Sequence, residues 1–359
     1  MSRRWRLAIW LGLSLVVLLI GTAVAIGLWG WHEIFDPYQG YSEDETHLEV
    51  PRGVDAGQIL LQLEKEGILA NAKLARFYLV YKLGDPPLKA GEYRFSGPLS
   101  TPEVLLRLAR GEVVTHPVTI IEGLTLEETA QQLGSSGFGD PEQFVAAMRS
   151  PRLITDLDPQ APDLEGYLFP ETYQFARGTT EEEIVATMVA TFRQRFEDSV
   201  ATLLAGEEAL PLRQLVTLAS IVEKEAQLAT ERPVIAGVYT NRLRRRMPLQ
   251  ADPTVIFALR ELGTYDGNLR RTDLEVDSPY NTYVYPGLPP GPIASPGLAS
   301  LEAAARPADV PYLYFVSRND GSHVFAETLS EHNRNVYKWQ KLYWRQRWAE
   351  ERRQEAEQD

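Results

Sequence analysis

The sequence has 359 residues and no cysteine. This excludes a disulfide framework and a thiolate nucleophile, and it fits an exported protein that needs no oxidative folding. Histidine is scarce, with five residues and no His-Glu-x-x-His motif. His323 and His332 are candidate metal ligands, but polar positions in a cleft or on the surface are favoured for both. With no Gly-rich phosphate loop either, we expect no metal and no other cofactor.

Positive charge is in deficit, because 36 Lys and Arg face 49 Asp and Glu. The resulting net charge of −13 and pI near 5.0 argue against a nucleic-acid partner, which would favour a basic face. A polymer handled by this chain is therefore expected to bind through shape and hydrogen bonds.

A long uncharged run is present near the N-terminus, from Leu7 to Trp31. At about 1.5 Å per helical residue it is long enough to cross a ~30 Å hydrocarbon core. Arginines precede it at positions 3, 4 and 6, so the positive-inside rule keeps residues 1–6 cytoplasmic and places the chain after His32 outside. We expect a single-pass membrane anchor. The alternative is a cleaved signal peptide, with Ala23 and Ala25 as its small-residue pattern.

The exported part is expected to hold a linker, a small module and a larger domain. Residues 32–46 are polar and read as a linker. Residues 47–117 combine short strands with helices in a small α+β module without catalytic candidates; within it, Ser100 and Glu103 form a helix-capping pattern. Beyond it, helices over 140–148, 180–204 and 211–228 precede a strand at 311–316 and its hairpin partner at 323–325. The overall fold class is α+β, with 118–340 as the larger domain and 341–359 as a charged helical tail.

An irregular stretch, Ser278–Gly297, contains six prolines, three glycines and three tyrosines. A segment of this length without helical or alternating periodicity is uncommon in a compact domain unless it lines a functional surface. We interpret it as an ordered loop that forms one wall of a cleft, with a purely structural cover over the core as the alternative.

The best candidate for chemistry is Glu225, in the predicted helix 211–228. At 100° per residue it falls at the edge of the apolar stripe of that helix, whereas Glu223 points elsewhere. A carboxyl beside apolar side chains has a raised pKa and can hold a proton for donation near neutral pH. The alternative is that Glu225 forms an ion pair with a residue such as Arg232 or lies at the boundary with water. Ser220 and Lys224 share one helix face, but they lack the Ser-x-x-Lys spacing of known acyl enzymes.

Several motifs resemble the YceG-like family of endolytic murein transglycosylases, in order and in spacing. The matching segments are LASIVEKE (218–225), ER (231–232), NRL (241–243), LQADPTVIFAL (249–259), the loop 278–297, PYLYFV (311–316), HVF (323–325) and EHN (331–333). The resemblance covers essentially the whole chain. It implies that 47–117 is similar to a LysM domain and that 118–340 is the catalytic domain.

The resemblance also implies the reaction. The second glutamate of the EKE motif, here Glu225, would protonate the glycosidic oxygen between N-acetylmuramic acid and N-acetylglucosamine in nascent peptidoglycan. It would then take a proton from the muramyl C6 hydroxyl as a 1,6-anhydro ring closes. Peptidoglycan glycan strands would be the substrate and peptidoglycan synthases (penicillin-binding proteins) the partners. Substrate-binding candidates are Glu223, Gln250, Asp252, Tyr280, Asn281, Thr282, Tyr283 and His323.

The sequence leaves two other functions open. A lysozyme-like hydrolase would use Asp252 as a second carboxylate and water as the nucleophile. A non-catalytic protein would bind glycan and organise the wall-synthesis machinery.

Overall fold

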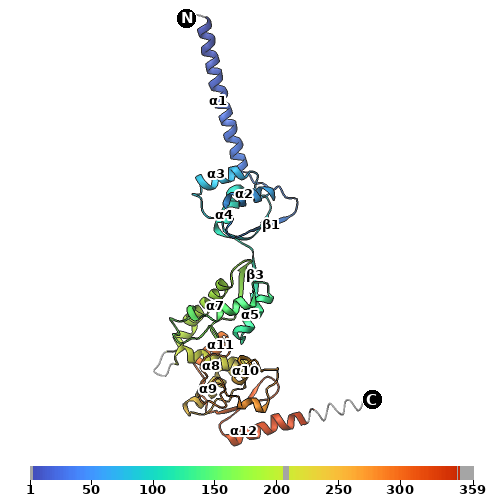
Figure 1. Cartoon of the computed structure of the whole chain (residues 1–359), viewed down its shortest axis with the longest axis vertical. Coiled ribbons are helices and arrows are strands. Elements are labelled where there is room, and N and C mark those ends of the chain that lie inside the picture. Colours follow the sequence, from blue (N-terminus) through green and yellow to red (C-terminus); the bar gives the residue numbers. More distant parts are fainter. Residues whose placement is uncertain (1–2, 205–209, 346, 348–359) are drawn as a thin grey trace, which may run out of the picture. The chain divides into compact units, whose positions relative to one another are not determined.

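A computed structural model describes residues 3–204, 210–345 and 347. The chain mixes helices with short strands (Figure 1), so the predicted α+β class is confirmed. It divides into two compact units, Met1–His116 with Gln174–Gly178, and Pro117–Tyr173 with Thr179–Asp359. The domain boundaries drawn from the sequence stay predictions.

Helix α1 spans Arg3–Phe35. Within it, Trp10–Phe35 is long and apolar enough to cross a membrane, and its large apolar side chains from Trp10 to Trp31 are exposed. The helix thus continues on both sides of the uncharged run that was predicted to be the anchor.

The rest of the first unit is built around an antiparallel pair, β1 (Glu45–Val50) and β2 (Gly91–Ser96), in which Leu48 lies opposite Tyr93. Helices α2 (Ala56–Lys65) and α3 (Ala72–Tyr81) connect the two strands, and α4 (Thr101–Arg110) follows them. Their apolar side chains share one core, which includes Leu63 and Phe95. Helix α3 has no counterpart among the sequence predictions; it begins after Asn71, whose side chain accepts hydrogen bonds from the backbone N–H groups of the first turn.

Helix starts follow the sequence signals. Glu103 accepts a hydrogen bond from the backbone N–H of Ser100 at 2.8 Å, which confirms the predicted capping pattern. Helix α5 (Leu126–Ser135) repeats the arrangement with Thr125 and Glu128. Such reciprocal bonds satisfy amide groups that the helix itself leaves without partners.

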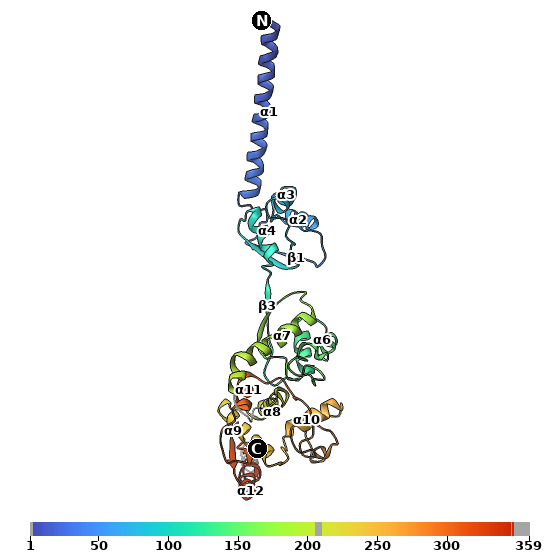
Figure 2. The same ribbon diagram turned by 90° about the vertical axis from the view of Figure 1, so that its left-hand side faces the viewer.

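The second unit contains most of the helices. β3 (Thr115–Thr119) pairs with β4 (Thr172–Ala176), and the division between the two units falls within both strands. Within the second unit, α6 (Pro141–Met148) and α7 (Glu181–Arg195) confirm two predicted helices. Helices α8 (Leu212–Glu225), α9 (Arg232–Arg244), α10 (Asp252–Glu261) and α11 (Leu298–Ala305) form the part around the site. Helix α8 is buried without interruption from Leu215 to Val222, and α9, α10 and α11 all contact it (Figure 2). The remaining turns are 3-10 or π in type: Pro151–Leu153, Phe196–Val200, Ala201–Leu204, Ala229–Glu231, Arg271–Glu275 and Tyr337–Leu342.

The predicted loop and hairpin are both present. No helix or strand occurs between Glu275 and Leu298 in this fully described stretch. β5 (Tyr314–Ser317) and β6 (His323–Ala326) form an antiparallel hairpin with Phe315 opposite Phe325, and α12 (Leu329–Val336) packs on both strands.

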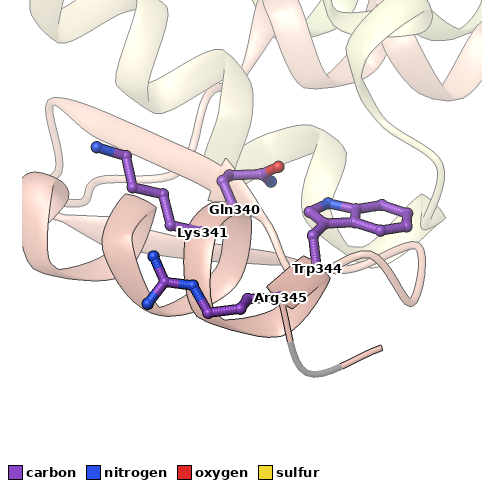
Figure 3. Close-up of a pocket in the computed structure, with 4 residues that line it drawn as sticks. All are labelled: Gln340, Lys341, Trp344 and Arg345. Carbon is purple, nitrogen blue, oxygen red and sulfur yellow. The ribbon is translucent and has the colours of Figure 1, made fainter. Parts of the chain in front are cut away.

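Beyond α12 the chain continues as a helix along the hairpin. Asn319 Nδ2 donates to the carbonyl of Trp339 at 2.7 Å, and Gln340 Nε2 donates to the carbonyl of Ser317 at 3.1 Å. Figure 3 shows Gln340, Lys341, Trp344 and Arg345 around a shallow hollow on this helix. The predicted tail 341–359 is helical where it is described; residues 346 and 348–359 lie outside the described residues.

Candidate active site

Helix α8 ends at Glu225. The side chains of Leu218, Ile221 and Val222, which come before it, are fully inaccessible. Glu225 lies one turn further along, where the helix leaves the core and its carboxyl reaches the rim of a cavity. Ala226 still donates its N–H to the carbonyl of Val222, but its own backbone is extended, and this change of conformation ends the helix. The partial negative charge at a helix C-terminus disfavours a carboxylate there.

The cavity next to Glu225 has a volume of about 320 Å³. Its lining is mostly polar and comes from segments far apart in the sequence: the end of α8, helix α9, the start of α10, the loop, the hairpin and α12. The lining residues are Glu225, Tyr239, Arg242, Leu249, Gln250, Asp252, Tyr283, Phe315, Val316, Ser317, His323 and His332. Five of the nine site residues predicted from the sequence, Glu225, Gln250, Asp252, Tyr283 and His323, are therefore brought together.

Burial dominates the electrostatics of Glu225. It raises the pKa of this carboxyl from its usual 4.5 to about 7; a hydrogen bond from Tyr239 lowers the pKa, the charge of Asp252 raises it, and Arg242 lowers it. The Tyr239 hydroxyl donates to Glu225 Oε1 at 3.0 Å. A carboxyl with this pKa retains its proton in a large fraction of molecules at neutral pH, as a general acid must.

The raised pKa of Glu225 predicts a pH dependence of stability. The unfolded chain releases this proton near its ordinary pKa of 4.5, whereas the folded chain holds it until about 7. The folded state therefore binds more protons over this interval, and this group's contribution to the free energy of unfolding falls as pH rises from 4.5 through 7. Relative to wild type, Glu225→Gln should gain on the order of 2 kcal/mol between pH 4.5 and pH 8. Thermal unfolding at both pH values measures this difference; a constant difference would contradict the raised pKa.

Tyr239 lowers the pKa of Glu225, because its hydroxyl donates a hydrogen bond that stabilises the charged carboxylate. Tyr239→Phe keeps the buried ring and removes the hydrogen bond, so the pKa of Glu225 should rise and the alkaline limb of the kcat/KM profile should move to higher pH. The measurement is the pH profile of cleavage for both proteins; a limb that stays in place or moves to lower pH would contradict this role.

Arg242 is a buried cation at the base of the cavity, with 7% of its surface exposed. Its Nε donates to the carbonyl of Leu313 at 2.6 Å and its Nη1 to that of Leu249 at 2.7 Å, while the guanidinium lies 5.2 Å from the ring centre of Tyr314. Burial lowers the pKa of Arg242. These bonds tie α9 to the start of β5 and to the segment before Gln250, so Arg242 fixes two walls of the cavity.

Gln250, Asp252 and Tyr283 form another part of the cavity lining. Gln250 has φ 49°, in the left-handed region that side chains rarely adopt, and its side chain is exposed at the cavity. Backbone strain of this kind costs on the order of 1 kcal/mol and is found preferentially at functional sites. The Tyr283 hydroxyl donates to Asp252 Oδ1, which joins the loop to the first turn of α10.

His323 reaches the cavity from β6 and is held by Glu231. The Glu231 carboxylate accepts from the backbone N–H of His323 at 2.9 Å, and its other oxygen lies 2.7 Å from Nδ1. Both side chains are largely buried, with 9% and 13% exposed. His332 lines the same cavity from α12 and stacks on Tyr314. Within the described residues, no group of three or more His, Asp and Glu side chains is arranged to hold a metal ion.

The other four predicted residues lie outside the cavity lining. Glu223 forms an ion pair with Arg232 at 3.0 Å and accepts from the backbone N–H of Gly297. Asn281 and Thr282 are buried; Asn281 Oδ1 accepts from the N–H of Tyr283, and Thr282 Oγ1 accepts from that of Ala251. Tyr280 packs on Phe257 with ring centres 4.8 Å apart, and burial raises its pKa to about 12. Asn281 and Thr282 therefore do not face the cavity; they bond to the backbone of Tyr283 and Ala251, which are next to or part of its lining.

Sequence reasoning assigned no role to Tyr239, Arg242 or Glu231. Arg242 and Glu231 are both part of sequence motifs that match the family. For Arg242 there was a further sign, because it is a charged residue among the buried positions of α9. Tyr239 had no such signal, because an aromatic residue on a helix is ordinarily part of the core.

Comparison with known proteins agrees with the motifs. The model of the YceG-like family matches residues 48–338. The endolytic murein transglycosylase of Bacillus subtilis strain 168 is 32% identical over 338 residues, which are 90% of this chain and 91% of that protein. The protein of the same name from Streptococcus pneumoniae D39 is 32% identical over 86% of this chain and 62% of its own length. The crystal structure of a YceG-like protein from Listeria monocytogenes has 33% identity and a TM-score of 0.55, covering 82% of this chain and 99% of that one.

Proposed function

Because this chain belongs to the YceG-like family, we propose that it is an endolytic murein transglycosylase with Glu225 as its general acid. It cleaves the bond between N-acetylmuramic acid and N-acetylglucosamine within peptidoglycan glycan strands and leaves 1,6-anhydro-muramyl ends. The observation that carries the role of Glu225 is its position: a carboxyl with a pKa of about 7 at the rim of a polar cavity.

One general acid is enough to start this reaction. Glu225 transfers its proton to the glycosidic oxygen, the bond from that oxygen to C1 of the muramyl residue breaks, and the muramyl C6 hydroxyl bonds to C1. An internal hydroxyl already held near C1 has a high effective concentration, so the site needs no second carboxylate to position water. The C6 hydroxyl proton leaves to a base, for which the Glu225 carboxylate produced in the first step is one candidate.

Substrate contacts are proposed for Gln250, Asp252, Tyr283 and His323, which surround the Glu225 carboxyl in the cavity. Sugar rings present many hydroxyl groups, and the amide, carboxylate, phenol and imidazole offer both donors and acceptors to them. The roles first predicted for Glu223, Asn281 and Thr282 become indirect in this proposal, because each has protein partners for its polar atoms.

Hydrolysis is the second candidate, since Asp252 shares the cavity with Glu225 and could activate water. Mass spectrometry of fragments released from purified sacculi separates the two reactions. Transglycosylation leaves anhydro-muramyl ends, whereas hydrolysis leaves reducing ends that are one water heavier. A water-heavier product set from the wild-type protein would transfer the proposal to the hydrolytic mechanism.

We also propose that α1 anchors the enzyme in the cytoplasmic membrane with residues 1–6 inside and the catalytic unit outside. The span Trp10–Phe35 supports the anchor, and the arginines before it support the orientation. An enzyme held there meets glycan strands as synthases produce them, so peptidoglycan synthases are the proposed partners.

A further inference from the structure

The cavity contains a histidine whose partners determine its chemistry. Glu231 accepts from His323 twice, through Oε1 from the backbone N–H and through Oε2 from Nδ1. A carboxylate only accepts hydrogen bonds, so it keeps the imidazole proton on Nδ1. The lone pair of the neutral ring is then on Nε2. A carboxylate that orients a histidine in this way is the arrangement by which proteins make an imidazole a base.

The surroundings direct Nε2 toward the cavity. Glu231, on the Nδ1 side, is not among the residues that line the cavity, whereas His323 is. Phe315 lies edge-on to the imidazole with ring centres 5.3 Å apart, and Phe325 lies at 6.4 Å. These aromatic rings pack against the imidazole, and His323 lines the cavity that also contains Glu225, so we infer that a ligand there meets the Nε2 edge.

We infer that the Glu231–His323 pair is a second proton-transfer group of this active site and that His323 Nε2 takes the proton of the muramyl C6 hydroxyl. This inference rests on the proposed transglycosylase activity. The need for such a group follows from timing: while Glu225 still holds the proton destined for the glycosidic oxygen, it cannot accept another one. A separate base lets the C6 oxygen attack C1 as the glycosidic bond breaks.

The C6 oxygen forms a bond to C1, and the bond between C1 and the glycosidic oxygen breaks. The Glu225 proton goes to that leaving oxygen, and the C6 hydroxyl proton goes to Nε2. The site then contains an imidazolium beside the Glu231 carboxylate, together with a Glu225 carboxylate. Return of one proton from His323 to Glu225 through water restores the starting state.

Two substitutions test the pair. In Glu231→Gln, the amide oxygen accepts from the backbone N–H of His323, which leaves the amide NH2 facing Nδ1. That donor moves the imidazole proton to Nε2 and removes the base. His323→Gln removes the imidazole itself. Each should lower kcat by about 10²-fold, and the double variant should lose little more than His323→Gln alone, because the two residues act as one unit.

The product ratio is the readout that a merely structural role would not change. Without a base for the C6 hydroxyl, water competes for C1, so the fraction of water-heavier reducing ends should rise in both variants. His323→Ala with added imidazole at pH 8 should regain part of the lost rate, which requires a role for the ring itself. The matched control is His116→Gln, which removes another carboxylate-paired histidine, 3.1 Å from Glu92; its rate and products should equal those of wild type.

The outcomes separate the inference from the proposed function. Wild-type digestion without anhydro ends would reject the function, and the inference with it. If wild type produces anhydro ends but Glu231→Gln and His323→Gln have unchanged kcat and an unchanged product ratio, the inference is overturned. The proposed function is then left intact. The inference would also be overturned if the rate in these variants fell only in proportion to the fraction of folded protein in thermal unfolding, and if imidazole had no effect on His323→Ala.

Discussion

Replacing Glu225 with glutamine should reduce the rate of glycan cleavage by about 10³-fold or more, since the amide is nearly isosteric with the acid but has no proton to give. Glu225 is the last residue of α8 and accepts a hydrogen bond from Tyr239, and a glutamine oxygen can accept the same bond. We therefore expect the fold to persist and the loss to appear in kcat. Quantifying fragments released from purified sacculi by wild type and variant measures the effect.

The same substitution at a glutamate outside the cavity provides the control. Glu182 is an exposed glutamate on α7, far along the chain from the cavity, and Glu182→Gln should digest sacculi at the wild-type rate. If Glu225→Gln digested sacculi as fast as Glu182→Gln does, Glu225 would not be the acid.

Replacing Glu223 with alanine should instead destabilise the second unit by about 3 kcal/mol, the usual cost of removing one partner of a buried ion pair. Glu223 and Arg232 expose 6% and 12% of their side chains, and Glu223 also accepts from the N–H of Gly297, at the end of the long loop. The loss leaves the Arg232 guanidinium and that amide without this acceptor. A decrease of the melting temperature by roughly 5–10 °C is expected.

The two glutamates of the same motif should therefore fail in different ways. At a temperature where Glu223→Ala is still folded, it should retain far more activity than Glu225→Gln, because its carboxyl is absent from the cavity lining. Glu182→Ala serves as the stability control and should change the free energy of unfolding by less than about 0.5 kcal/mol. Loss of activity in a fully stable Glu223→Ala protein would mean that this carboxyl contacts substrate directly.

The separation of Glu223 from Glu225 was predictable from helical periodicity alone. Two residues apart on a helix are roughly 200° apart, and the structure places Glu225 at the cavity while Glu223 faces Arg232 and the loop. The extent of the loop 278–297 was predictable as well, because six prolines in twenty residues leave few positions for a regular ladder.

The orientation of individual loop residues could not be predicted in the same way. Asn281 and Thr282 are polar and lie beside Tyr283, so composition alone suggests that all three face the substrate. In the structure the two are buried and bond to backbone groups, while Tyr283 reaches the cavity. In an irregular segment no repeat relates position to direction, and only the tertiary contacts decide which side chain points inward.

Partners from distant parts of the chain were equally beyond sequence reasoning. Glu231 and His323 are separated by 92 positions in the sequence. Tyr239 on α9 donates a hydrogen bond to Glu225 on α8. Periodicity describes one element at a time, whereas these pairs depend on how elements pack. The tautomer of His323 arises from such a pair, and the raised pKa of Glu225 arises from its burial among packed elements. The residue types were therefore visible in the sequence and their chemical states were not.

Glu225 can act as the general acid only if its carboxyl retains its proton close to neutral pH. Infrared difference spectroscopy of the full-length protein in detergent, with Glu225→Gln as the reference, isolates the C=O stretch of the protonated acid and follows it with pH. We expect a band that disappears with a midpoint near pH 7. A band already lost at pH 5 would show that the carboxyl is ionised at working pH and would contradict its role as the acid.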